Sequence, residues 1–297
     1  MTWAVAAALA GAFSVAAGAA VHDRALLTAP IRGIGQLALL RALMRMPVWW
    51  LGTLLTMGGI IAHLWALTQA PLVVIQPIGI TGLLFAVVLS AVFRRRRPSP
   101  AQVLGSLAVS IALAGLLTTV PHAQGRAPDA MGLTEIAVIA GTAMALCVAV
   151  GRTRRGALRA GSFALASGIA YAATSAFGRV IGIAALSDPF AALQPMTMVA
   201  VGIGLTGGLI MQNAYRTDHF TLAYATLMLS DPIAATFIGV AYFGERLPTD
   251  PAHAAVAAGA AVLGAVGVVT LARASGPQRP ARTGQPPRSD DLSATSA

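Results

Sequence analysis

Charged residues are scarce in this chain, and lysine is absent. Only 10% of the 297 residues are charged, and all 20 basic residues are arginine. A soluble domain carries about 25% charged residues, so this chain has too little charge to cover a surface that faces water. With 57% hydrophobic residues and a mean hydropathy of +0.75, the composition indicates a protein embedded in lipid.

Cysteine occurs once, at Cys147, inside an apolar run. A single thiol excludes a disulfide framework and a multi-cysteine metal site within one chain. The chain also lacks a Walker A phosphate loop, the HExxH motif of zinc proteases and the GxSxG turn of serine hydrolases. We therefore expect no ATP-driven activity, no enzyme activity and no cofactor.

Apolar runs of roughly 18–25 residues recur along the chain, long enough to cross ~30 Å of hydrocarbon. They predict an all-α fold, a polytopic membrane helical bundle with nine transmembrane helices. The first run has no basic region before it, which favours a membrane helix over a cleaved signal peptide. The predicted helices lie at about 2–21, 48–69, 71–93, 100–120, 131–151, 158–185, 195–214, 219–243 and 252–273.

The segment 31–46 is ambiguous because it is short for a membrane span. Arg41 and Arg45 lie one turn apart on one face of this segment. This pattern is typical of an amphipathic helix that lies at the membrane surface. The alternative is a tenth, short transmembrane helix.

The arginines lie in short loops between apolar runs and in the C-terminal tail, which indicates membrane topology rather than a nucleic-acid surface. With nine spans and a cytoplasmic C-terminus, only Arg126 and Arg246 fall in outside loops, whereas ten spans would also move Arg24 and Arg32 outside. Residues 274–297 are rich in proline, serine and glycine and predict a disordered cytoplasmic tail. We expect an integral protein of a bacterial inner membrane, surrounded by lipid, with a second copy of the chain as a candidate partner.

Two pairs of stretches recur at nearly the same spacing along the chain. The spacing crosses an odd number of predicted spans, so the two halves would face opposite ways in the membrane. Residues 1–121 and 131–273 are therefore predicted to be inverted structural repeats, an arrangement typical of secondary transporters. The paired stretches are LTMGGIIAHLWAL (55–67) with GLTGGLIMQNAYR (204–216), and AVFRRRRPS (91–99) with AYFGERLPT (241–249).

The acidic residue Asp231 lies in the middle of the predicted helix 219–243 and precedes Pro232. A charge near the bilayer centre costs ~2.5 kcal/mol or more, so this carboxyl group must face the bundle interior, be paired, or be protonated. Tyr224 shares its helical face. Asp231 is a candidate proton carrier or substrate contact; the structural alternative is that it neutralises a neighbouring group such as Arg179.

Other polar residues also occur inside apolar runs. His63 is a candidate proton relay or substrate contact, and the alternative is a hydrogen-bonded histidine at a packed interface. The adjacent Gln212 and Asn213 suit substrate recognition or bonding between helices equally well. The full set of candidate substrate- or proton-binding residues is Asp231, His63, Gln212, Asn213, Tyr215, Tyr224 and Gln76. Any metal site would depend on Asp231.

Three stretches carry a resemblance to a known family. They are WWLGTLLTMGGIIAHLWALTQAPLVVIQPIG (49–79), QNAYRTDHFTLAYATLMLSDPIAATF (212–237) and GERLPTDPAHAAVAAGAAVLGAVGVV (244–269). They resemble the NIPA-type magnesium-transporter branch of the drug/metabolite transporter (EamA-like) superfamily. The resemblance implies an inverted five-plus-five helix bundle, with the first half one span short, and secondary transport by alternating access.

The chain departs from that branch at two acidic positions. The acid of the second helix falls at Ile60, and the glutamate that follows the third helix falls around Arg95. A hard divalent cation prefers several oxygen ligands, and Asp231 is the acid that remains in mid-membrane. The expected substrate is therefore a small metabolite, a drug-like solute or a divalent cation. A non-transporting membrane scaffold or accessory subunit is the alternative function.

Overall fold

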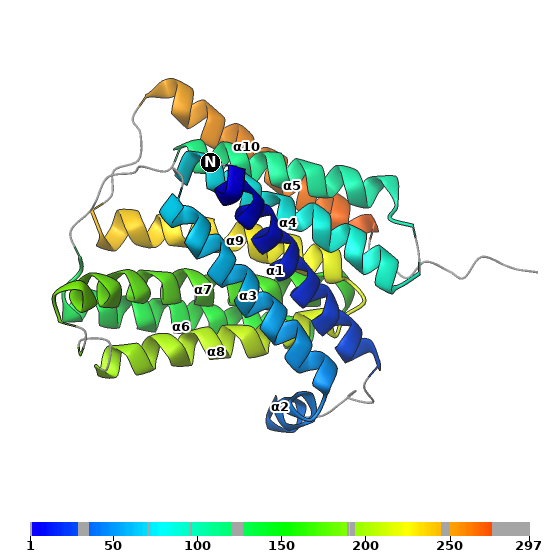
Figure 1. The fold of residues 1–297 in the computed structure, drawn as a ribbon, viewed down its shortest axis with the longest axis horizontal. Coiled ribbons are helices and arrows are strands. Elements are labelled where there is room, and N and C mark those ends of the chain that lie inside the picture. Colours follow the sequence, from blue (N-terminus) through cyan, green and yellow to red (C-terminus); the bar gives the residue numbers. More distant parts are fainter. Residues whose placement is uncertain are drawn as a thin grey trace, which may run out of the picture.

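The computed structural model describes residues 2–28, 36–69, 72–95, 97–119, 127–188, 190, 194–244 and 250–274. These residues form ten α-helices and no strand, which confirms the predicted all-α fold (Figure 1). The helices are α1 (Thr2–Thr28), α2 (Gln36–Met44), α3 (Pro47–Gln69), α4 (Leu72–Phe93), α5 (Pro100–Thr119), α6 (Ala130–Thr153), α7 (Gly156–Ser187), α8 (Pro195–Tyr215), α9 (Phe220–Tyr242) and α10 (Pro251–Ala274).

Six of the described helices are long and apolar enough to cross a membrane: α1, α6, α7, α8, α9 and α10. Within α4 and α5, shorter apolar stretches cover Thr81–Phe93 and Pro100–Leu116. Large apolar side chains such as Ile61, Leu104 and Phe237 are exposed on the outside of the bundle. Such a surface suits contact with lipid rather than with water, so the prediction of a membrane-embedded helical chain is confirmed.

The segment whose span was ambiguous contains the short helix α2, and residues 31–35 of it lie outside the described part. At nine residues, α2 is about 14 Å long, less than half the thickness of the hydrocarbon core. Figure 1 shows α2 nearly end-on beside the start of α3, so it runs across the direction of the long helices. The described helix α2 is therefore too short to cross a membrane by itself.

The boundary predicted for the first helix was wrong, because α1 does not end at residue 21. It continues to Thr28 and carries His22 and Asp23 into the bundle, where both side chains are buried. The charges at Asp23 and Arg24 resembled a loop in the sequence, but Asp23 has a partner inside the protein. The predicted tail, residues 274–297, lies outside the described residues beyond Ala274.

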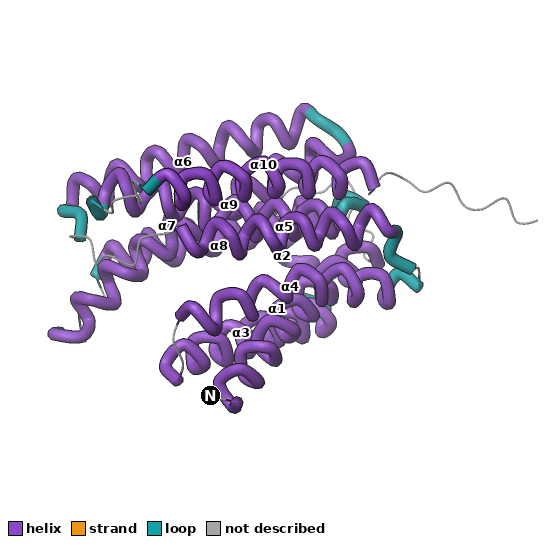
Figure 2. Tube along the Cα trace, turned by 90° about the horizontal axis from the view of Figure 1, so that it is seen from above, coloured by secondary structure: helices purple, strands orange, loops and turns teal. Residues whose placement is uncertain are grey.

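The helices pack in two groups. In the first half, α1 packs most extensively on α3 and α4; in the second half, α7 packs on α6, α8 and α9. The α5 and α10 helices pack against each other, and α4 contacts α9. Figures 1 and 2 show α1 and α3 crossing the layer formed by α6, α7 and α8.

Glycine allows the close approach of α1 and α3. A Cβ atom at Gly59 would lie 2.7 Å from the Gly11 carbonyl oxygen and 2.8 Å from the Val15 amide nitrogen, whereas a Cβ atom at Gly58 would meet nothing within 4 Å. We therefore expect Gly59→Ala to destabilise the protein by about 1–3 kcal/mol, since the backbones must move apart. Gly58→Ala, its matched control, should leave the thermal midpoint of the purified protein unchanged or higher. Equal midpoints for the two variants would contradict this packing.

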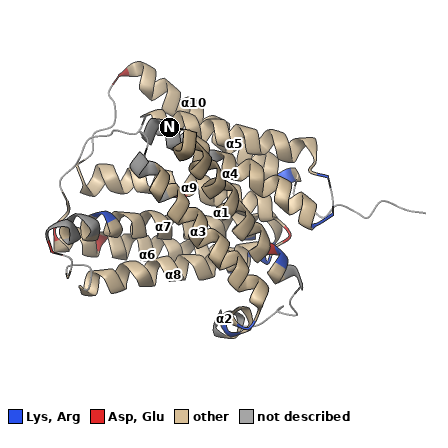
Figure 3. Cartoon of the chain, viewed as in Figure 1, with Lys and Arg blue, Asp and Glu red and all other residues tan. Residues whose placement is uncertain are grey.

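Charged residues lie mostly at the two ends of the helices (Figure 3). We call one end, where α1, α4, α6, α8 and α10 finish, the arginine-rich end. The described arginines at this end are Arg24, Arg41, Arg45, Arg94, Arg95, Arg97, Arg152, Arg154, Arg155, Arg159, Arg216 and Arg273. The opposite end carries Asp129, Glu135, Asp188 and Asp250 together with Arg179. The two ends therefore differ in the sign of their charge.

Candidate functional site

Asp231 lies at the midpoint of α9 and is partly buried. The backbone of α9 comes close to α7 at this point, because a Cβ atom at Gly168 would lie 3.0 Å from the Asp231 amide nitrogen. Its carboxylate interacts electrostatically with the hydroxyl group of Tyr171, also on α7. Among the described residues no hydrogen bond is made to this carboxylate. The predicted acid is thus inside the bundle, beside α7, without a neutralising partner in the described part of the chain.

Arg179, the neutralising partner considered from the sequence, lies near the opposite end. Its guanidinium group stacks over the ring of Phe243, with 4.7 Å between the guanidinium carbon and the ring centroid. Phe243 directly follows α9, so the guanidinium group is placed at the end of that helix rather than at its midpoint. Its contact with Phe243 is a cation–π interaction.

Pro232 lies inside α9, next to Asp231. Proline has no amide hydrogen, so the carbonyl of Met228 lacks the donor that a continuous helix would supply. The Pro232 carbonyl, in turn, accepts a hydrogen bond of 2.8 Å from the Thr236 hydroxyl. Backbone oxygens of this kind, beside a carboxylate, can bind a positively charged or hydrogen-bond-donating group.

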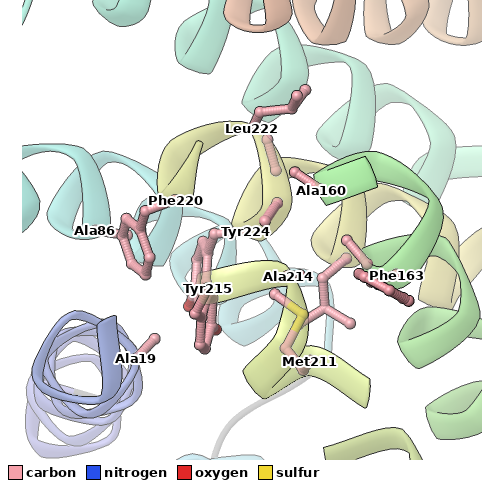
Figure 4. Close-up of a cluster of buried hydrophobic side chains, with 14 of the residues drawn as sticks. Ala19, Ala86, Ala160, Phe163, Met211, Ala214, Tyr215, Phe220, Leu222 and Tyr224 are labelled. Carbon is pink, nitrogen blue, oxygen red and sulfur yellow. The ribbon is translucent and has the colours of Figure 1, made fainter. Parts of the chain in front are cut away.

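Three aromatic residues, Tyr215, Phe220 and Tyr224, form what we call the aromatic cluster. The ring centroids of Tyr215 and Phe220 are 5.2 Å apart, and those of Phe220 and Tyr224 are 5.9 Å apart. All three side chains are buried, and they face Ala19 of α1 and Ala86 of α4 (Figure 4). The structure thus brings together two of the predicted site residues, Tyr215 and Tyr224, where the second half meets the first.

A buried ion pair lies at the arginine-rich end. Arg94, just after α4, donates hydrogen bonds of 3.0 Å from its Nη2 atom to both carboxylate oxygens of Asp23 on α1. Asp23 is only 2% exposed. Arg94 also lies 4.0 Å from the Asp218 carboxylate, in the loop between α8 and α9. Arg94 therefore lies between acids from the two halves of the chain.

Sequence reasoning missed Asp23, although a signal for it was present. Ala16, Ala19 and Ala20 precede Asp23 by seven, four and three residues, so all four lie on one helical face. The three alanines are buried, and a continuous buried face extends the helix to Asp23. The neighbouring His22 donates a hydrogen bond of 3.1 Å from Nε2 to the Trp49 carbonyl oxygen of α3. Two consecutive residues thus join α1 to α4 and to α3.

His219 adjoins the same ion pair from the start of α9. Its side chain is buried, and its ring lies 3.8 Å from the Cβ position of Gly156, the first residue of α7. Burial lowers the pKa of His219 below its ordinary value of 6.5, Asp218 acts in the opposite direction, and Arg94 lowers it further. The imidazole is therefore neutral at pH 7 and adds no positive charge to Arg94.

The remaining predicted residues occupy other places. Gln212 is buried in α8, and its Oε1 atom has no hydrogen-bond partner in the described part of the chain. The side chain of Asn213 donates to the Leu209 carbonyl of its own helix, at 2.9 Å. His63 lies between α1 and α4, with its Cε1 atom 3.2 Å from the Cβ position of Gly79. Gln76 falls in α4, but its side chain lies outside the described residues.

Tyr171, which the sequence analysis did not single out, lies on α7 against α8, with its hydroxyl oxygen 3.6 Å from the Cβ position of Gly208. Its hydroxyl interacts electrostatically with Asp231 on one side and with Tyr215 on the other. Tyr215 in turn interacts with Tyr224 and with Asp23. These interactions act through space, since no hydrogen bond joins Asp231, Tyr171, Tyr215 and Asp23 in the described part of the chain.

A metal site would need several of these groups together. Within the described ranges, no group of three or more His, Cys, Asp or Glu side chains could hold a metal ion. The described oxygens next to Asp231 along α9 include its carboxylate, the Ser230 hydroxyl and backbone carbonyls. This set suits a single positive charge.

The comparisons with known proteins gave no relative from which a function could be transferred. The resemblance to the NIPA-type branch of the drug/metabolite transporters therefore rests on the stretches quoted above, and function has to be argued from the site. No family model, no curated protein and no solved structure matches this chain significantly.

Proposed function

We propose that this chain is a secondary transporter that moves a small, positively charged solute across a membrane by alternating access. The cargo classes are a cationic metabolite, a drug-like amine or a divalent cation, in exchange for protons. The single observation that carries the proposal is the carboxylate of Asp231. It lies at the midpoint of a membrane-length helix, faces another helix, and has no hydrogen-bond partner in the described part of the chain.

The packing of the helices supports a bundle of two inverted repeats, residues 1–121 and 131–273. The partners of α1 are α3 and α4, and the partners of α7 are α8 and α9, while α5 pairs with α10. We infer that these two sets are equivalent and that α6 is the span without a counterpart in the first half. Nine spans then cross the membrane, and α2 lies at its surface.

The direction of the helices supports the inversion. The α1 helix ends at the arginine-rich end, whereas α7 begins there with Arg159 in its first turns. Close approach occurs at Gly59 against α1 and at Gly207 against α7. This pairs Gly59 with Gly207, one position away from the alignment of the glycine pairs in the sequence. Repeats of opposite orientation allow the two halves to rock about a central site.

The positive-inside rule then orients the protein. Arginines gather at cytoplasmic loops because translocating them is unfavourable. The arginine-rich end is therefore the cytoplasmic end, and α10, which finishes there with Arg273, leads to a cytoplasmic C-terminus. A bacterial inner membrane is the proposed location.

The sign of the cargo charge follows from Asp231. A lone carboxylate in a low-dielectric region is stabilised by one bound positive charge, either a proton or a cationic cargo. Competition between the two for the same group couples their movement in opposite directions. Tyr171, which interacts electrostatically with Asp231, supplies a hydroxyl and an aromatic ring that suit an organic ammonium group.

Reconstituted liposomes test this function directly. We expect the protein to take up cationic solutes when a proton gradient is imposed. We expect Asp231→Asn to lower the uptake rate at least about tenfold, the effect of losing about 1.4 kcal/mol of charge interaction. Asp188→Asn, which removes an exposed acid at the opposite end, is the matched control and should transport normally. Substrates to screen are quaternary and protonated amines, Mg²⁺ and neutral metabolites.

The scaffold alternative makes the opposite prediction for the same experiment. A non-transporting subunit would show no gradient-dependent uptake of any of these solutes. Transport that is unchanged in Asp231→Asn would remove the assigned role of the carboxylate even if the protein is a transporter.

A further inference from the structure

Arg94 makes two ion-pair contacts at the arginine-rich end, and they differ in length and burial. One lies within the first half, and the other joins the two halves. Arg94 holds Asp23 with two donors, since its Nε atom lies 3.3 Å and its Nη2 atom 3.0 Å from the same carboxylate oxygen. This contact lies within the first half, and Asp23 is buried. The Arg94–Asp218 contact is 4.0 Å long, and the Asp218 side chain is 69% exposed. Separation of the halves would therefore break the contact to Asp218 and keep the contact to Asp23.

The aromatic cluster closes the bundle beside this ion pair. The second half presents the large rings of Phe220 and Tyr224, and the first half presents the small side chains of Ala19 and Ala86 (Figure 4). Phe220 is 2% exposed, so the contact excludes solvent. Alanine does not interdigitate deeply with the rings, so the two surfaces can part without changing any rotamer of the first half.

The contact between the halves is not the same along the bundle. In Figure 2, α1 and α3 approach the second half toward the arginine-rich end and diverge from it toward the N-terminus of α1. The ion pair and the aromatic cluster both lie at the end where the halves converge. This places the closure on one side of Asp231, because Tyr215 is the last residue of α8 and Phe220 is the first residue of α9, whereas Asp231 lies at the middle of α9.

We propose that Arg94, together with Asp23, Asp218 and the aromatic cluster, is the gate that closes the arginine-rich end of the cargo path. The inference rests on the transport function proposed above. In this gate Asp23 fixes the position of the Arg94 guanidinium group, and Asp218 is the contact that breaks. Opening exposes the alanine surface of the first half and the path toward Asp231.

Asp218→Arg tests the gate, because it replaces a weak attraction to Arg94 with repulsion at a site that is already exposed. The reporter is Ala86→Cys in a Cys147→Ala background, since Ala86 is fully buried against Phe220 and Cys147 is the sole native cysteine. A charged, membrane-impermeant methanethiosulfonate reagent is applied to liposomes whose arginine-rich end is accessible. We expect Asp218→Arg to raise the labelling rate at least about tenfold, a shift of about 1.4 kcal/mol in the opening equilibrium.

Asp188→Arg is the matched control, because it makes the same exchange at an exposed acid of the opposite end. It should leave the labelling rate unchanged, and both variants should keep the thermal midpoint of the reporter protein. Asp218→Asn, which removes the attraction without adding repulsion, should give an intermediate rate. Equal labelling of the Asp218→Arg and Asp188→Arg proteins would overturn the gate.

The labelling assay does not depend on transport, so the two proposals can fail separately. Faster labelling in Asp218→Arg without uptake of any solute would show that the contact between the halves opens at this end, and it would reject the transport function. Normal uptake with unchanged labelling would keep the transport function and reject the gate.

Discussion

Arg94→Gln is expected to lower the free energy of unfolding by about 3–5 kcal/mol, because the change leaves the Asp23 carboxylate buried and without its charged partner. Asp23 is 2% exposed and receives hydrogen bonds of 3.0 Å from Arg94 at both oxygens. A desolvated carboxylate cannot recover this interaction from water. The thermal or denaturant-induced unfolding of the protein in detergent measures the effect.

The double variant Asp23→Asn with Arg94→Gln separates a lost charge pair from a lost side chain. Two neutral amides can hydrogen-bond to each other, so the double variant should recover more than half of the loss. Arg95→Gln is the matched control, since Arg95 is the neighbouring residue and is exposed; surface changes of this kind stay within about 0.5 kcal/mol. Equal losses for Arg94→Gln and Arg95→Gln would show that the ion pair adds nothing to stability.

The helices could be predicted from the sequence because lipid imposes a simple rule: a spanning segment must be apolar over about 20 residues and satisfy its own backbone. The rule failed at the end of α1, where the predicted helix stopped at about residue 21, before Asp23, although α1 continues to Thr28. A charged residue interrupts an apolar run in the sequence, but the helix can continue past it when a residue of opposite charge lies inside the protein. That partner, Arg94, is distant in the sequence, in a run of four arginines that the topology rule assigned to a loop.

The candidate site was predictable only in part for a similar reason. Asp231 stood out because a single acid in an apolar helix is costly, whatever its neighbours are. Tyr171 did not stand out, because a tyrosine in a membrane helix is ordinary, and its electrostatic interaction with Asp231 depends on how α7 and α9 pack. His63 and Asp231 were grouped by their chemistry, but the fold places them in different halves. His63 lies beside Gly11 and Gly79, and Asp231 lies beside Gly168.

Glycine positions also show what an alignment of the two halves by sequence alone leaves undetermined. The sequence aligned the Gly58–Gly59 pair with the Gly207–Gly208 pair. In the structure the close contacts are at Gly59, 2.7 Å from the Gly11 carbonyl oxygen, and at Gly207, 2.6 Å from Ala170 Cβ. The spacing of residues decides which helical face each of them occupies. The glycine of each pair that matters for packing is therefore the one on the face in contact with the neighbouring helix. The letters could not tell which one that is.

Gly168→Ala is expected to have the second large effect, because the added methyl group has no room between α7 and α9. Its Cβ atom would overlap the Ser230 hydroxyl oxygen and would lie 3.0 Å from the Asp231 amide nitrogen. Backbone atoms cannot rotate out of the way as a flexible side chain can. The α9 helix must therefore move away from α7 at Asp231. We expect a loss of about 1–3 kcal/mol in unfolding free energy, together with loss of solute uptake in liposomes.

Gly178→Ala is the control on the same helix, since a Cβ atom there would meet nothing within 4 Å. Alanine favours helix over glycine by about 1 kcal/mol, so Gly178→Ala should be as stable as the parent or more stable and should transport normally. Adding Ser230→Gly to Gly168→Ala removes the hydroxyl and the Cβ atom that block the new methyl group, and should restore part of the stability. If uptake also returns in that double variant, the position of Asp231 against α7 is what transport requires. If stability returns and uptake does not, Ser230 itself takes part in binding, and the site extends one residue beyond the carboxylate.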